Sequence, residues 1–405
     1  MIVSKSFRWI ESHFIAALVG SASFCASPLV LSDSGIMDTL QVHGFLSQAL
    51  IITDENEFFG PSNQGAGSFE YTEIGLNTSL RPHQDILLAA QVLSRRAGGE
   101  SSDALPELDY GLIDYQMVSN QERTFGIQLG RIKNPFGFYN QTRDVAFTRP
   151  SILLPQSIYF DRTRSLGLSG DGVTLYHDEK LATGSIRTQL GFGKARIEND
   201  VEQTLGLDSF PGSLEPGSSA IGQIRYEHDG GRIITALSTA KANADYNSYA
   251  NQPGNGSFQF QPWVFSFQYN QELWTLTAEF ATRHLELTGF ESIANSSTRG
   301  ESWYLQFTRR FNNNWQWLVR YDSLVNNRDD RSGKSFEARG LGPAHSQFAD
   351  DLTFGLQWTP HPQVMLAGEY HHVDGTGWWP NQDNSESKET SRRWNMVLFQ
   401  LSLRF

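Results

Sequence analysis

Two patterns run together along most of this chain and leave few folds open to it. Apolar and polar residues alternate with a period of two in about sixteen segments of roughly 8–12 residues. The connections between these segments alternate between short and long. The short connections include 81–85, 119–123, 177–182, 228–232, 270–272, 311–315 and 360–363, and the long ones include 54–69, 96–106, 133–170, 194–219, 242–257, 326–349 and 374–391. A soluble sandwich has no reason to keep its long loops on alternate connections, whereas a membrane barrel with turns at one end and loops at the other does.

The two rows of each segment differ in chemistry as a barrel wall requires. In segment 315–325 an apolar row alternates with a polar row, and a closed barrel leaves no strand edge unpaired in lipid. The apolar row is Trp315, Trp317, Val319 and Tyr321, and the polar row includes Gln316, Arg320 and Asp322. The sequence therefore predicts an all-β fold: a transmembrane antiparallel up-and-down β-barrel of about 16 strands, with 14 or 18 as alternatives. For any single segment, an amphipathic strand of a soluble protein remains the alternative.

Composition excludes several classes of protein. Lys plus Arg is 32 and Asp plus Glu is 44, which gives a formal net charge of −12. This acidic balance argues against general nucleic-acid binding, because no basic surplus is present to neutralise phosphates. A single Cys excludes a disulfide framework and a Cys-based metal site. Mean hydropathy of −0.40 argues against a bundle of transmembrane helices.

The N-terminal segment is typical of a secretory signal peptide. Lys5 and Arg8 precede a small-residue, apolar stretch over 14–31. We expect a signal peptide over 1–32 and the barrel over 33–405, with a buried helix or signal anchor as the alternative for 14–31. Cys25 follows the bulky Phe24 where a lipobox has a small residue, which argues against acylation. The candidate cleavage points follow Ala22, Ala26 and Ser32.

The last residues carry a more specific pattern. One face of the final segment is formed by Val397, Phe399, Leu401, Leu403 and the terminal Phe405. This pattern resembles the closing strand of Gram-negative outer-membrane proteins, the segment that their assembly machinery recognises. The resemblance implies that Leu401, Leu403 and Phe405 form an assembly signal and that the protein resides in the outer membrane of a Gram-negative bacterium.

The segment G-R-I-K-N-P-F-G at 130–137, followed by T-R-D at 142–144, resembles the G-x-x-K-x-P-F-G region of phosphate-selective porins and their relatives. The resemblance extends over the chain after the signal segment. It implies a porin barrel, commonly a homotrimer, whose longest connection, 133–170, folds into the lumen and constricts the pore. Lysines are few and form no cluster, so the resemblance does not extend to phosphate as the solute.

The charges of segment 133–170 suggest a role in selecting solutes. Its charged residues are the cations Lys133, Arg143, Arg149, Arg162 and Arg164 and the anions Asp144 and Asp161. A narrow passage magnifies each fixed charge, so a net positive loop predicts weak anion preference. The alternative is that these cations pair with carboxylates and only hold the loop in place. The candidate pore-wall residues on inward rows are Arg283, Arg310, Arg320, Asp322, Glu279 and Glu369.

These features predict a passive diffusion channel rather than an enzyme. The expected partners are small hydrophilic solutes or anions, outer-membrane lipid, lipopolysaccharide and the assembly machinery, with no nucleic acid. No cofactor or metal site is expected, because His371 and His372 are adjacent and project to opposite faces of a strand. The sequence contains no nucleophile-elbow pattern. A structural, adhesive or receptor barrel with a closed lumen is the alternative function.

Overall fold

A single antiparallel sheet dominates the computed structural model, which describes residues 35, 37–99, 104–250, 253–379, 383–384 and 390–405. The predicted signal peptide at 1–32 lies outside the described residues. The strands are β1 (Gln41–Thr53), β2 (Ser68–His83), β3 (Ile86–Ala97), β4 (Glu107–Ser119), β5 (Arg123–Lys133), β6 (Ser169–Leu181), β7 (Gly184–Ala195), β8 (Gly212–Pro216), β9 (Ser218–His228), β10 (Ile233–Ser248), β11 (Gly256–Asn270), β12 (Trp274–Thr288), β13 (Ser296–Arg310), β14 (Trp315–Val325), β15 (Phe348–His361), β16 (Val364–Gly375) and β17 (Arg393–Arg404). The helical segments are η1 (Met37–Thr39), η2 (Asn140–Thr142), η3 (Ala146–Thr148), α2 (Arg164–Leu168), α3 (Asn199–Leu205), η4 (Asp229–Gly231), η5 (Arg328–Asp330), α4 (Lys334–Ala338) and η6 (Ala344–Gln347).

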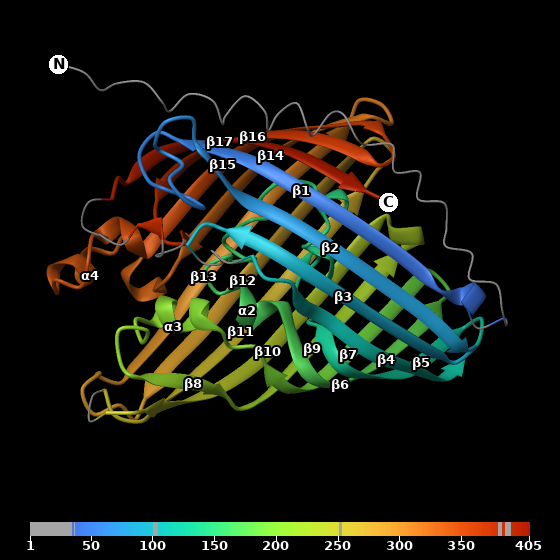
Figure 1. Ribbon diagram of the computed structural model, residues 1–405, viewed down its shortest axis with the longest axis horizontal. Helices are drawn as coiled ribbons and strands as arrows, with labels where there is room; N and C mark the ends of the chain where they lie inside the picture. Colours follow the sequence, from blue (N-terminus) through green and yellow to red (C-terminus); the bar gives the residue numbers. More distant parts are fainter. Residues whose placement is uncertain (1–34, 36, 100–103, 251–252, 380–382, 385–389) are drawn as a thin grey trace, which may run out of the picture.

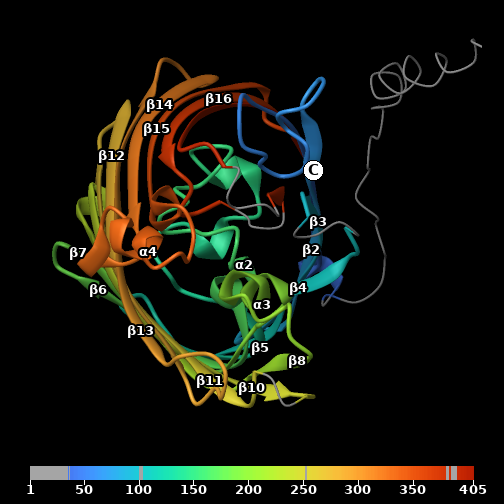
Figure 2. The ribbon, with the colours of Figure 1, turned by 90° about the vertical axis from the view of Figure 1, so that its left-hand side faces the viewer.

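The sheet closes on itself (Figures 1 and 2). Strands β1 to β7 pair in chain order, β7 pairs with β9, β9 to β17 continue in order, and β17 pairs with β1. Short β8 pairs with the far end of β10 and is not part of the ring. The predicted barrel of 16 antiparallel strands is therefore confirmed. Among the described residues, no helix combines the length and apolar character that a membrane crossing requires.

Connection lengths separate the two ends of the barrel. Strand bounds leave turns of two to four residues at one end, from 84–85 after β2 to 362–363 after β15. All the longer connections lie at the other end, including 134–168 after β5 and 326–347 after β14. We call these the turn end and the loop end. Strand β1 begins and β17 finishes at the turn end, as an even number of antiparallel strands requires.

The predicted rows of β14 face opposite sides of the wall. Tyr321 is 40% exposed on the outside, whereas the inward Arg320 and Asp322 are fully buried. Aromatic rings also gather on the outside near the turn end, where Trp315 stacks on Trp358 at 5.3 Å between ring centroids. Such a band suits the interface between lipid and water.

One predicted loop is shorter than expected. The sequence predicted a long connection over 242–257, but β10 continues to Ser248 and β11 begins at Gly256. The reason is packing: inward Ala244 and Tyr246 are buried in an apolar cluster that also includes Val201 of α3, and β8 pairs with this extension of β10. The alternation of inward and outward residues therefore continues through this part of β10. Polar residues between the apolar positions hide it in the sequence.

An apolar cluster fills one side of the interior at the loop end. Inward residues of β1, β16 and β17 pack against side chains from three long connections. The cluster includes Ile51, Phe58, Phe59, Ile152, Leu153, Val373, Trp378, Trp379, Trp394, Met396 and Leu398. The cluster therefore fills the loop end of the barrel near β1 and β17.

Candidate functional site

Segment 134–168 contacts inward residues of strands around the barrel. In Figure 2, α2 and the neighbouring part of this segment lie inside the ring of strands. Gly137 N donates to Ser238 Oγ of β10 at 3.1 Å, and Ser157 N donates to Asp322 of β14 at 3.4 Å. Ile152 N donates to Glu369 of β16 at 2.5 Å. The segment is thus tied to the wall at several separate strands.

Two predicted wall carboxylates act as anchors for this segment. Glu279 accepts hydrogen bonds from Tyr159 Oη at 2.7 Å and from Phe138 N at 3.0 Å. Tyr304 Oη of the wall also donates to Glu279, at 2.8 Å. Glu369 accepts from the backbone N–H groups of 152 and 153. Because their oxygens are occupied by the loop, these carboxylates are held in place by it and, in turn, fix its path.

The glycines of the 130–137 motif have backbone roles. Gly137 has a φ of +59°, and a Cβ there would lie 2.8 Å from Glu279 Oε1. Gly130 has a φ of +126° beside the backbone of β4. Only glycine tolerates such positions without strain. Asn140 Nδ2 closes the base of the loop by donating to the carbonyl of Gly167 at 2.8 Å.

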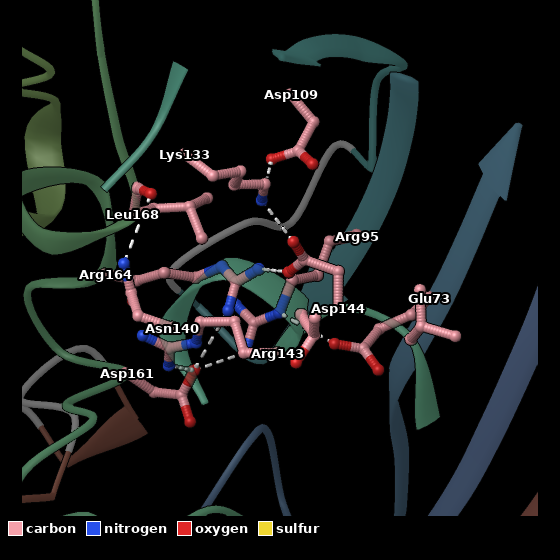
Figure 3. A network of polar contacts seen from close by, with 12 residues as sticks. Glu73, Arg95, Asp109, Lys133, Asn140, Arg143, Asp144, Asp161, Arg164 and Leu168 are labelled. Atoms are coloured by element: carbon pink, nitrogen blue, oxygen red, sulfur yellow. Dashed lines mark hydrogen bonds and ion pairs between the residues drawn. The ribbon is translucent and has the colours of Figure 1, made fainter. Parts of the chain in front are cut away.

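Four of the five loop cations lie in one buried network of ion pairs. Figure 3 labels Lys133, Arg143 and Arg164 within this network. Lys133 Nζ lies 2.6 Å from Asp109 Oδ1 and also contacts Asp144. Arg164 pairs with the same Asp144. These groups are almost fully removed from solvent. Burying a charge is costly unless it is paired, so this pairing is what allows the cations to be buried.

The network continues toward β2 and β3. Asp161 Oδ1 lies 2.7 Å from Arg95 and 3.3 Å from Arg143. Glu73 Oε2 lies 2.9 Å from Arg149. In all, five cations share four carboxylates, two of which come from strands. The ion pairs considered as the alternative are therefore present for Lys133, Arg143, Arg149 and Arg164.

Arg162 has a different environment from the other loop cations. Its Nη2 donates to Asn326 Oδ1 at 3.2 Å, and its Cζ lies 5.4 Å from the centre of the Phe160 ring. Arg283 of β12 lies 4.7 Å from the same ring and donates to the carbonyl of Ser157 at 2.9 Å. Within the described parts of the chain, neither guanidinium forms an ion pair with a carboxylate.

The remaining predicted wall residues occupy separate places. Arg320 is buried and donates to Ser151 Oγ at 3.0 Å and to Thr353 Oγ1 at 3.3 Å, so it also holds the loop. Arg310 is exposed at the turn end of β13, away from the loop. Asp322 is buried beneath the backbone of 157. Most of the predicted wall residues therefore hold segment 134–168 in place.

Sequence reasoning missed two members of the network, Arg95 and Asp109. Arg95 is adjacent to Arg96 in β3, so the alternation places one guanidinium inside the barrel and the other outside. This alternation of inward and outward side chains is the sequence pattern that could have identified Arg95 as an inward residue. Asp109 lies at a register shift between β3 and β4, between Leu108 and Tyr110, which obscures the alternation there.

The apolar residues of the predicted assembly signal lie on the outer face of the barrel. The 61%-exposed Phe405 covers Gly44 with its ring, and its backbone N–H donates to the carbonyl of Gly44 at 3.0 Å. Leu401 and Leu403 share this outer face and pair with β1 and β16. Their position is that of the closing strand of the barrel.

Adjacent His371 and His372 project to opposite faces, as predicted. His371 is buried between Asp351 and Glu369, whereas His372 lies outside and contacts Asn395 at 2.8 Å. In the residues that the structure describes, no group of three or more His, Cys, Asp or Glu side chains is arranged to hold a metal ion.

Three cavities lie along β6 to β13. The largest, about 770 Å³, opens at the loop end and is lined by Phe160, Arg162 and Arg283 among others. A narrow one of about 70 Å³ shares Phe160 and Arg283 with it and reaches Ile221 and Asn140. A third of about 330 Å³ near the turn end is lined by charged and amide residues. These are Gln141, Asp178, Arg187, Gln189, Gln223, Arg225 and Glu227, together with Ser185 and Ile186.

Comparison with solved structures identifies the fold as that of a porin. The chain is similar to an anion-selective porin from Comamonas acidovorans, with a TM-score of 0.57 and 10% identity over 90% of this chain and 99% of that one. It is also similar to OmpT of Vibrio cholerae (TM-score 0.56, 8% identity, 90% and 97% covered). The outer-membrane channel DcaP of Acinetobacter baumannii gives a TM-score of 0.53 at 12% identity, over 90% and 97% of the two chains. No protein-family model and no curated protein matches the sequence.

Proposed function

We propose that this protein is an outer-membrane porin, a passive diffusion channel for small hydrophilic solutes. The observation that carries the proposal is the row of cavities along β6 to β13, which lies inside a closed barrel and extends from the loop end to the turn end. Transport through such a path needs no cofactor and no chemical step, because solutes move down their own gradient.

The constriction of this path is the narrow cavity beside segment 134–168. Its lining combines Tyr159 and Phe160 of the segment with Ala281 and Pro262 of the wall. The cavity near the turn end begins beside Gln141, one residue beyond Asn140 of the narrow cavity. Since the segment is tied to the wall by Glu279 and Glu369, its position sets the width of the path.

We assign the weak anion preference of this channel to Arg162 and Arg283. They are the cations beside the path that have no carboxylate partner in the described part of the structure. Arg143 of the buried network also lines the narrow cavity, but the network cations contribute little, because carboxylates screen them. A charge in a narrow passage acts strongly on a permeating ion.

The fold also supports a proposal for where the protein resides and what it contacts. We propose that the protein resides in the outer membrane of a Gram-negative bacterium, contacts lipopolysaccharide, is recognised through Phe405 by the assembly machinery and forms a homotrimer. One of the similar OmpT structures is described as a trimer form. Outward Gly368 places no side chain of its own on the outer surface of β16, which would suit a subunit contact. We propose that the likeness of 130–137 to phosphate-selective porins reflects a relationship to that group.

A closed-lumen structural or receptor barrel is the second candidate. The apolar cluster of Phe58, Phe59, Trp378 and Trp379 favours it, because such side chains fill part of the interior. Liposome swelling separates the two functions. Purified protein is incorporated into liposomes and exposed to arabinose, glucose and raffinose. A porin gives swelling rates that fall with solute size; liposomes with folded protein that swell no faster than protein-free ones would support the closed barrel.

A further inference from the structure

The large cavity at the loop end has an unusual lining for so acidic a protein. Its volume is about 770 Å³, within the range of small-molecule sites. Arg162 and Arg283 are the charged residues of its described lining, which includes no carboxylate. The whole chain has a net charge of −12. Because all the charge of the described lining is positive in an otherwise acidic protein, the cavity points to an anionic ligand.

The two guanidiniums are both held close to one aromatic ring. Their Cζ atoms lie 5.4 and 4.7 Å from the centre of Phe160. Arg283 is oriented by the carbonyls of Ser157 and Val325, at 2.9 and 3.3 Å, and Arg162 by Asn326 at 3.2 Å. These bonds use only some of the five N–H donors of each guanidinium, so donors remain for a ligand. Burial lowers the pKa of Arg162 to about 10, which leaves it charged at neutral pH.

The rest of the described wall combines apolar side chains with Thr, Ser, Asn and Gln side chains. It comes from strands β11 to β13, from α2 and α3, and from described residues of the connections after β14 and β16. The apolar lining includes Leu166, Val201, Leu205, Phe258, Phe260, Leu285, Leu287, Phe336, Leu341, Pro343 and Trp379. A small inorganic anion would not contact the apolar surface, and a neutral aromatic compound would not form ion pairs with the two guanidiniums. A ligand that satisfies both features combines an anionic group with a flat apolar body.

We propose that this cavity is a binding site for aromatic carboxylates or sulfonates, whose anionic group is held between Arg162 and Arg283 and whose ring lies against the apolar wall. This inference rests on the proposed function, since it makes such anions the preferred solutes of the channel. Guanidinium and carboxylate groups form paired, charge-assisted hydrogen bonds, which would orient the ligand.

The test is isothermal titration calorimetry of the folded, detergent-solubilised protein with 2-naphthoate. We expect saturable binding that weakens at least tenfold in the double variant Arg162→Gln/Arg283→Gln. Arg339→Gln is the matched control, because it removes an exposed arginine at the same end that does not line the cavity. It should bind within a factor of two of the wild type. The neutral analogue 2-naphthalenemethanol and the small anion acetate should each bind at least tenfold more weakly than 2-naphthoate.

Two further variants keep the test decisive if the double variant folds poorly. Arg162→Lys/Arg283→Lys retains the charge and should recover part of the affinity, and Phe160→Leu removes the shared ring and should weaken binding. Equal affinity of wild type and Arg162→Gln/Arg283→Gln would overturn the site, as would equal affinity for acetate and 2-naphthoate. Swelling of liposomes without 2-naphthoate binding would refute the site and leave the channel standing. Binding without swelling would refute the channel and leave the site standing.

Discussion

Arginines on the two sides of segment 134–168 have opposite electrostatic environments. On the side of β2 to β4, Arg143, Arg149 and Arg164 are buried and share carboxylates with Arg95 and Lys133. On the side of β12, Arg162 is half-buried and borders a large cavity. Its guanidinium donates a hydrogen bond to the side-chain amide oxygen of Asn326. The same residue type therefore holds the loop on one side and faces solutes on the other, and the neighbouring carboxylates decide which.

The largest expected effect comes from making the same substitution on the two sides. Arg149→Gln leaves Glu73 buried with a weaker partner and should lower the free energy of unfolding by about 3 kcal/mol. Arg162→Gln leaves no carboxylate without its ion-pair partner and should change the free energy of unfolding by less than about 1 kcal/mol. Urea titration followed by intrinsic fluorescence measures both. Equal losses in the two variants would remove the distinction between the two sides.

A smaller effect is expected where the loop turns toward the β12 side. Gly137→Ala forces a side chain into a positive φ and against Glu279 and Tyr159, and should cost about 1–3 kcal/mol. Gly340→Ala is the matched control, because Gly340 has a φ of +72° but open space around its Cβ position. Urea titration should therefore show a smaller loss for Gly340→Ala, of about 1 kcal/mol. A loss at Gly340 as large as that at Gly137 would show that backbone strain, rather than the Glu279 anchor, sets the cost.

The smallest effect concerns pH. Asp200 of α3 accepts hydrogen bonds from Ser165 N at 2.9 Å and Ser165 Oγ at 2.5 Å, beside the buried network. Burial raises the pKa of Asp200 above its usual value, and these hydrogen bonds only partly oppose the shift. A raised folded-state pKa means that the contribution of Asp200 is full below its unfolded pKa and is lost as pH rises through the folded one.

The difference in unfolding free energy between wild type and Asp200→Asn should therefore fall as pH rises from 3.5 to 6, because the neutral Asn does not titrate in this range. Urea titrations at these pH values give the difference. A difference that grows with pH would show that the ionised carboxylate is the stabilising form.

The sequence was sufficient for the barrel because its constraints are local. Alternation in each strand sets which side chains meet lipid, and Arg320 and Tyr321 lie on the predicted sides. The alternation of short and long connections likewise follows from strand ends that local residues define. These features need no knowledge of which strands are neighbours.

The site was less predictable because it depends on contacts between distant segments. The loop cations could be found from sequence, but their partners Glu73 and Asp109 lie 76 and 24 residues away from Arg149 and Lys133. The apolar side chains of Phe58 and Trp378 lie on loops, where no period reveals that they pack together. Whether an arginine is paired or free therefore required the structure.

The most direct test of the account is the zero-current potential of the purified protein in a planar bilayer under a KCl gradient, for the wild type and for Arg162→Gln/Arg283→Gln. The account predicts an ion-conducting wild type with a modest chloride preference, and a conducting double variant that has lost it. A cation-selective wild type, or a chloride preference unchanged in the double variant, would contradict the role of Arg162 and Arg283. Folded wild-type protein that gives no conductance would contradict the channel itself.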